Sequence, residues 1–178
     1  MKIAIQAADL DASRIDGTRV YIYNLLKHFG LLDSGSEFFI YHRKVFNLEI
    51  APPNFLNYHI RKKDFPFFWT QLCFSRELRR DNPEVLWMPM HNIPLWRNKK
   101  LKTVVTIHDL AFKYFPNHFT KKTLCELNLL SGWAINKSDK IIAVSESTKK
   151  DILKFYPHIP EKKIKIIHHG FDNEVFGR

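Results

Sequence analysis

The 178-residue chain carries 28 Lys and Arg against 18 Asp and Glu, which gives a formal net charge of +10. A hydrophobic fraction of 45% and an aromatic fraction of 14% exclude a disordered chain, and the length allows one substantial core. Apolar runs stay below the roughly 18 to 20 residues that cross a bilayer, and Met1-Lys2 leads into a strand pattern instead of a signal peptide. We therefore expect a soluble cytoplasmic protein of one domain, with an anionic partner such as a phosphate, an acidic lipid surface or a nucleic acid.

The N-terminal third alternates predicted strands with one predicted helix. Residues 2–8 form the first expected strand, and Thr18 is the expected cap of a helix that ends at Phe29, before Gly30. Apolar residues recur in this helix at i, i+3, i+4 and i+7: Ile22, Leu25, Leu26 and Phe29. Two further strands are expected at residues 37–42 and 58–61.

A second helix is expected from Pro66 to about Arg80. Its apolar residues are Phe65, Trp69, Leu72 and Leu78, and its last turn is rich in arginine, where cations favour the helix dipole. Packing of this amphipathic helix on a sheet is the favoured interpretation, and contact with a membrane surface is the alternative.

The C-terminal half continues the alternation of strands and helices. Strands are expected at residues 83–88, 103–107, 139–144 and 163–167, with helices at 120–136 and from Ser145 to just before Pro157. Thr148 and Asp151 have a spacing like that of a capping box, and the β-branched run 103–107 is typical of a strand buried on both faces. This order predicts an α/β fold, a Rossmann-like doubly wound and mostly parallel sheet.

Metal and redox sites are not expected. Cys73 and Cys125 fall in predicted helices among apolar neighbours, so both are interpreted as reduced packing residues. His168 and His169 are neighbours in an expected strand end and would point to opposite faces, which disfavours a shared metal ion. The absence of a G-x-G-x-x-G sequence after the first strand disfavours a nicotinamide cofactor.

Polar residues follow five of the predicted strands at the point where each strand ends. The carboxyl ends of parallel strands share one edge, so we expect these residues to lie together: Gly17, His91-Asn92, His108-Asp109, Ser145-Glu146 and His168-His169-Gly170. Helices that begin near Gly17 and Ser145 would direct free N–H groups at the same edge. The pattern predicts a site for phosphate and sugar. His108 facing a ligand is favoured over a core histidine, and Ser145 either caps its helix or faces the ligand.

Four stretches carry a resemblance to a known family: GTRVYIYNLL (17–26), TIHDLAF with YFP (106–112, 114–116), SDKIIAVSES (138–147) and IIHHGFD (166–172). Together, and in this order, they resemble the N-terminal domain of a family 4 glycosyltransferase, a retaining enzyme of the GT-B architecture. The resemblance implies that residues 1–170 are the acceptor-side Rossmann-like domain. It also implies that 171–178 begin an interdomain linker, and that the C-terminal donor domain is absent from this chain.

The same resemblance implies an activity and its site. The activity is transfer of a hexose, with retention, from a nucleotide-sugar donor to a glycan or lipid-linked acceptor. It implies that neither a metal nor another cofactor is required, that nucleic acid is not a partner, and that this fragment alone has little turnover. The inner face of an acidic membrane is a candidate for peripheral contact. His108 is the candidate catalytic residue beside the transferred sugar. Candidate substrate-binding residues are Gly17, Thr18, Arg19, His91, Asp109, Ser145 and Gly170.

Two questions stay open at this point. Arg19 stands where many relatives have a second glycine. Its side chain either blocks the close approach of the nucleotide-sugar, or its guanidinium replaces the glycine and donates hydrogen bonds to the phosphates. The alternative function is a non-catalytic basic module that binds an acidic membrane or nucleic acid through residues 61–63 and 97–102. A third interpretation is another GT-B-like enzyme, such as a sugar-nucleotide epimerase.

Overall fold

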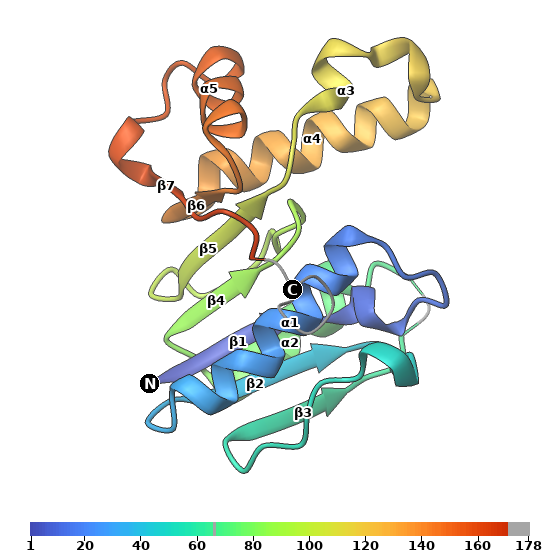
Figure 1. Cartoon of the computed structure of the whole chain (residues 1–178), viewed down its shortest axis with the longest axis vertical. Helices are drawn as coiled ribbons and strands as arrows, with labels where there is room; N and C mark the ends of the chain where they lie inside the picture. The colour runs from blue at the N-terminus through green and yellow to red at the C-terminus, as the bar shows by residue number, and fades with distance from the viewer. Residues whose placement is uncertain (66, 171–178) are drawn as a thin grey trace, which may run out of the picture.

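The computed structural model describes residues 1–65 and 67–170, in which seven strands form one parallel sheet (Figure 1). The strand order is β3-β2-β1-β4-β5-β6-β7, with every neighbouring pair parallel. The strands are β1 (Lys2–Gln6), β2 (Glu37–His42), β3 (Tyr58–Lys62), β4 (Val85–Met88), β5 (Lys102–Ile107), β6 (Lys140–Ala143) and β7 (Ile164–Ile166). The predicted Rossmann-like α/β fold is confirmed. The expected helix start at Pro66 and the expected linker 171–178 lie outside the described residues.

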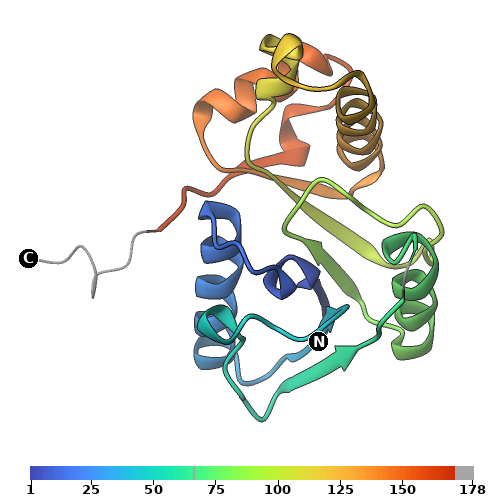
Figure 2. The ribbon, with the colours of Figure 1, turned by 90° about the vertical axis from the view of Figure 1, so that its right-hand side faces the viewer.

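Helices cover both faces of the sheet. The α-helices are α1 (Gly17–Leu32), α2 (Ser75–Asp81), α3 (Ala111–Tyr114), α4 (Lys121–Lys137) and α5 (Glu146–Phe155). Short turns of other helix types are η1 (Ala8–Asp11), η2 (Leu48–Ile50), η3 (Thr70–Phe74), η4 (Pro116–His118) and η5 (Glu161–Lys163). Figure 2 shows α1 on one side of the sheet and α2 and α4 on the other. None of the helices in the described part of the chain is long and apolar enough to cross a membrane.

The strand order explains this distribution of helices. The chain moves outward from β1 to β3, returns to β4, and then moves outward in the opposite direction to β7. Right-handed crossovers in opposite directions place their helices on opposite faces. Two apolar clusters result, one beneath α1 that includes Ile22 and Leu26, and one beneath α2, α4 and α5 that includes Leu78 and Ile152. The central strand β5 is buried on both faces as predicted, because Val105, Thr106 and Ile107 are all inaccessible to solvent.

The cap of α1 differs from the prediction, and at α5 only one of the expected capping features is present. Asp16, and not Thr18, caps α1, since its carboxylate accepts a hydrogen bond from the Arg19 N–H at 3.2 Å. A carboxylate at this position also interacts favourably with the positive end of the helix dipole. At α5 the cap is Ser145, whose hydroxyl accepts from the Thr148 N–H at 3.0 Å, so the box-like spacing of Thr148 and Asp151 is not used.

The predicted helix 66–80 and one cysteine also differ. The helical segment begins at Thr70 as the π-helical turn η3 and continues as α2. Trp69 and Leu78 are buried as expected, whereas Phe65 and Leu72 are exposed. Both cysteines are free, but Cys125 is exposed, so its interpretation as a packing residue is wrong.

Gly30 does not end α1, because the helix continues to Leu32 and uses this glycine for packing. The Tyr58 hydroxyl lies within the backbone ladder of the helix, accepting from the Gly30 N–H at 2.9 Å and donating to the Leu26 carbonyl. The Phe55 ring occupies the space above Gly30, so that an added Cβ atom would lie 2.1 Å from a ring carbon. The glycine is therefore required by the neighbouring ring, without any unusual backbone dihedral.

We expect Gly30→Ala to lower the free energy of unfolding, because the methyl group must displace the Phe55 ring. The loss should be about 1 to 3 kcal/mol, as for overpacked cores, despite the better helix propensity of alanine. Urea denaturation followed by circular dichroism measures it. The matched control is Gly132→Ala in α4, where an added Cβ would meet only the Tyr156 ring at 3.8 Å. An equal response of the two variants would contradict this account.

Candidate functional site

The N-terminus of α1 and the loop before it form one wall of the candidate site. The Arg19 guanidinium donates from Nε to the Asp9 carbonyl at 2.9 Å and pairs with the Asp16 carboxylate. Burial alone would raise the pKa of Asp16, but the Arg19 N–H and guanidinium outweigh it and hold that pKa below its usual range. The pKa of Asp9 is raised by its burial, an effect that Arg19 only partly offsets. Arg19 is therefore engaged by its own loop.

Gly17 and Thr18 occupy the first turn of α1. A Cβ atom added to Gly17 would meet nothing within 4 Å, so the space above this residue is open. The fold itself does not require glycine here. An open backbone at a helix N-terminus is suited to the close approach of an anion.

His108 follows β5 directly, at the carboxyl edge of the sheet. Its Nε2 lies 2.9 Å from the Pro89 carbonyl oxygen, which only accepts, so Nε2 carries the proton and donates. Burial lowers the pKa of His108 below the ordinary histidine value, against the opposing effect of the Pro89 bond. The ring is consequently neutral near pH 7, with Nδ1 as a hydrogen-bond acceptor.

Three rings from separate segments meet at this point. Tyr21 of α1 stacks on His169, with ring centroids 4.6 Å apart, and its edge faces the His108 ring at 5.2 Å. His108 and His169 lie 5.3 Å apart. Burial raises the pKa of the Tyr21 hydroxyl, while a hydrogen bond with Thr106 opposes that rise. The sequence interpretation missed Tyr21, although its place one helical turn after Gly17 puts it at the same edge.

His91 and Asp109 lie near His108, and Ser145 is connected to it through Thr148. His91 interacts electrostatically with both His108 and Asp109, and burial lowers its pKa. The Asp109 carboxylate accepts from the Ala111 N–H at 2.9 Å. Ser145 caps α5, as one of its two interpretations held, and Thr148 of that helix donates to the His108 carbonyl at 3.0 Å.

A groove of about 930 Å³ runs from this cluster along the α1 face of the sheet. One end of the groove contains Gly17, Tyr21, His169 and Gly170, and Asn24, Lys27, His28 and Asp33 add polar groups farther along its lining. The remaining lining is largely apolar and comes from α1 and from the strands beneath it: Ile3, Val20, Leu25, Phe38, Trp87, Val104 and Ile142. The structure thus brings the predicted residues to one edge, with Gly17 and Gly170 in the groove and His108 beside it. Their roles stay predictions. An open groove at this edge was expected, whereas its apolar extension along α1 was not.

The two histidines after β7 do not follow the expected strand alternation. The strand ends at Ile166, and both His168 and His169 line the groove. Within residues 1–65 and 67–170, no three His, Cys, Asp or Glu side chains form a group that could hold a metal ion.

Comparison with known proteins identifies the family. The sequence model described as Glycosyltransferase Family 4 matches residues 15–175. The chain belongs to glycosyltransferase family 4. Among solved structures it is similar to "lipopolysaccharide outer core galactosyltransferase WaaB apo form", with a TM-score of 0.53 and 17% sequence identity, over 94% of this chain and 45% of that one. No curated protein sequence matches. The structural similarity supports the GT-B-type fold, and this family 4 chain spans less than half the length of that galactosyltransferase.

We expect nuclear magnetic resonance to find the His108 ring protonated at Nε2, with a pKa below the ordinary 6.5. The buried ring resists protonation, so acidification below 6.5 favours the unfolded chain, which binds the proton more tightly. A ¹⁵N–¹H long-range correlation spectrum across a pH titration gives both quantities, and His108→Gln assigns the signal. A proton on Nδ1 would show that the Pro89 bond does not set the tautomer, and a pKa above 6.5 would show that burial does not govern the protonation of the ring.

Proposed function

We propose that this family 4 domain is the acceptor-side half of a retaining enzyme that transfers a hexose from a nucleotide-sugar to a glycan or lipid-linked acceptor. The observation that carries the proposal is the neutral His108 at an open sheet edge, beside the exposed N-terminus of α1. The proposal places the donor nucleotide mainly on a second domain, in the part of the GT-B architecture that this chain does not span.

His108 acts on the sugar in this proposal. During transfer the sugar passes through an oxocarbenium-like state, and the diphosphate leaves with increased negative charge. With Nε2 committed to Pro89, Nδ1 is left to accept a hydrogen bond from a sugar hydroxyl. By accepting this hydrogen bond, the neutral His108 ring fixes the orientation of the sugar. It does so without placing a second positive charge beside the oxocarbenium carbon.

The first turn of α1 acts on the phosphates. The Arg19 N–H is used by the Asp16 cap. The N–H groups of Gly17 and Thr18 and the positive dipole end therefore stabilise an anion that approaches over Gly17, where an added Cβ would meet no atom within 4 Å. Because Arg19 is held by Asp16 and Asp9, the proposal assigns it to shaping this loop instead of contacting the donor. No metal or cofactor of this domain is needed for either role.

A polypeptide that contains both this domain and its donor domain should transfer sugar. In it, His108→Ala should lower kcat by about 10²-fold or more, as expected when a group that orients the substrate is lost. The 178 residues alone should show no comparable turnover. Radiolabelled sugar transfer, measured at saturating donor, tests both. Turnover by the isolated domain at the rate of the two-domain protein would refute the assignment of the donor to a second domain.

The variant Gly17→Ala distinguishes a role of Gly17 in donor binding from a role in folding. The variant should keep its free energy of unfolding within about 1 kcal/mol of the natural chain, because the added methyl meets no protein atom. In the two-domain protein it should reduce kcat/KM for the nucleotide-sugar about tenfold or more, since the methyl occupies the path of the phosphates. Gly132→Ala, remote from the site, serves as the control. Unchanged kcat/KM in Gly17→Ala would remove α1 from the donor site.

A further inference from the structure

A cluster of large apolar side chains projects into solvent where the chain leaves β3 and β4. Phe67 and Phe68 are 74% and 76% exposed, and Trp96 is 57% exposed. Leu72 and Leu95 are also exposed. We call these five residues the aromatic patch: Phe67, Phe68, Leu72, Leu95 and Trp96. Single exposed apolar side chains are common on protein surfaces, whereas a group of large ones marks a candidate interaction site.

The backbone holds the two phenylalanines outward. Phe68 has a φ of 50°, which places a bulky residue in the left-handed region and costs free energy. The next residue, Trp69, turns inward, where its indole N–H donates to the Lys63 carbonyl at 2.8 Å and its ring stacks on Phe74. The buried Trp69 anchors the segment, and the strained turn leaves Phe67 and Phe68 without burial.

Gln71 ties the two parts of the patch together. Its side-chain oxygen accepts from the Leu95 N–H at 2.7 Å, and its side-chain nitrogen lies 3.4 Å from the Ile93 carbonyl. The loop after β4 is thereby fixed against the start of the η3–α2 segment. Leu95 and Trp96 accordingly lie beside the exposed face that carries Phe68 and Leu72.

Positive charge continues this exposed face. Arg76 and Arg79 follow Leu72 at helical spacing and are exposed, as are Lys62 and Lys63 before the patch. The acidic residues of α2 are engaged within the domain, Glu77 with Arg80 at 3.7 Å and Asp81 with Arg61 at 3.0 Å. Exposed Asp64 is the one opposing charge between Lys62 and the patch. An apolar centre with a cationic border matches the interface of an anionic bilayer.

We propose that the aromatic patch inserts into the headgroup region of an anionic membrane while Arg76 and Arg79 contact lipid phosphates. A second copy of the chain fits less well, because a symmetric contact would bring the arginines of both copies together. Nucleic acid fits less well because the aliphatic Leu72 and Leu95 offer no ring for base stacking. This inference is independent of the proposed sugar transfer.

The apolar part of the proposal is tested by sedimentation of the 178-residue chain with lipid vesicles. The chain should bind vesicles containing phosphatidylglycerol and bind pure phosphatidylcholine vesicles much more weakly. Phe67→Ser with Phe68→Asn should weaken binding about tenfold or more, since two exposed rings no longer enter the bilayer. Asparagine tolerates the left-handed backbone at position 68. The control variant is Leu32→Ser with Leu56→Ser, because these two leucines lie outside the aromatic patch and are 81% and 105% exposed.

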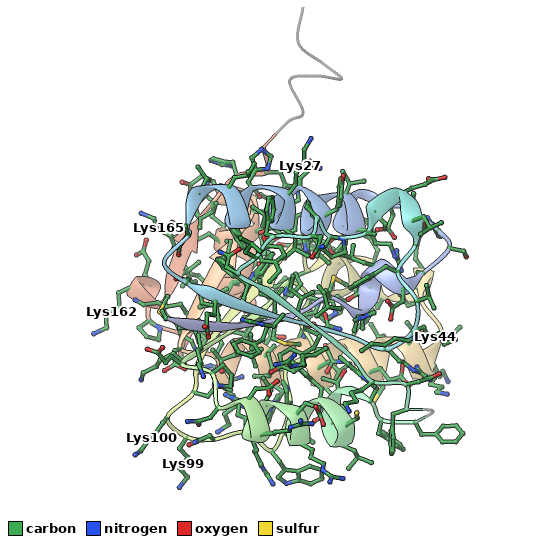
Figure 3. The ribbon with its side chains drawn as sticks, turned by 90° about the horizontal axis from the view of Figure 1, so that it is seen from below. Lys27, Lys44, Lys99, Lys100, Lys162 and Lys165 are labelled. Carbon is green, nitrogen blue, oxygen red and sulfur yellow. The ribbon has the colours of Figure 1, made fainter. Side chains whose placement is uncertain are left out.

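The electrostatic part has its own matched pair. Arg76→Gln with Arg79→Gln should weaken binding by about fivefold for each arginine at low salt, whereas Lys162→Gln with Lys165→Gln should have little effect. Lys162 and Lys165 protrude from the side of the molecule away from α2 (Figure 3). Urea midpoints no lower than that of the natural chain in all four variants show that folding is intact.

Quenching by brominated lipid gives a second readout that is independent of affinity. Fluorescence of the bound chain should be quenched, and Trp96→Phe should remove most of that quenching. The proposal is overturned if both variant pairs bind like their controls, or if Trp96 is not quenched. It is equally overturned if the patch substitutions abolish self-association of the chain while vesicle binding is absent. The patch and arginine substitutions should leave sugar transfer to a soluble acceptor by the two-domain protein unchanged, whether or not they weaken vesicle binding.

Discussion

The hydrogen bond from His108 Nε2 to the Pro89 carbonyl is the contact on which the site depends. It joins the segments that leave two central strands, β4 and β5, and it forms because parallel pairing brings their carboxyl ends to one edge. The bond fixes the tautomer, and burial keeps the ring neutral. The second support is Thr148, which connects the His108 backbone to the start of α5. The contacts come from the connections after β4, β5 and β6, so the site requires that these three strands be neighbours in the sheet.

The loop before α1 shows how a departure from the family pattern is accommodated. Arg19, at the expected place of a second glycine, donates to the Asp9 carbonyl and pairs with Asp16. Both partners lie in the polar segment that precedes the helix, and Asp16 also caps it. The arginine thus closes the loop on itself and leaves the backbone above Gly17 open. The two sequence interpretations of Arg19, obstruction or phosphate contact, both assumed a side chain directed at the donor, which the loop geometry does not show.

The fold was predictable because strands buried in a parallel sheet have short runs of apolar and β-branched residues in the sequence. The predicted strands 37–42 and 103–107 agree with β2 and β5 to within one residue. The gathering of His91, His108 and Ser145 followed from strand direction alone. The role of Tyr21, the apolar extension of the groove along α1 and the continuation of α1 past Gly30 did not follow, since they depend on tertiary neighbours such as His169 and Phe55. Local spacing also chose the wrong cap, because Thr18 and Asp16 are both capping residues and only the chain path before the helix distinguishes them.

Part of the positive charge behind the net +10 is used inside the domain and not for a ligand. Lys163 donates to the Ile135 and Asn136 carbonyls at the end of α4, at 2.7 and 3.0 Å, and Arg97 donates to the Lys137 carbonyl there. These cations satisfy exposed carbonyls and the negative end of the helix dipole. Lys102 pairs with Asp139 and Arg61 with Asp81, so both basic stretches once considered for nucleic acid are partly used inside the domain. Figure 3 shows the labelled lysines spread around the molecule. Nucleic acid binding needs cations that neutralise successive phosphates. Arg76 and Arg79 instead lie next to the uncharged aromatic patch, an arrangement that favours a bilayer surface over a nucleic acid.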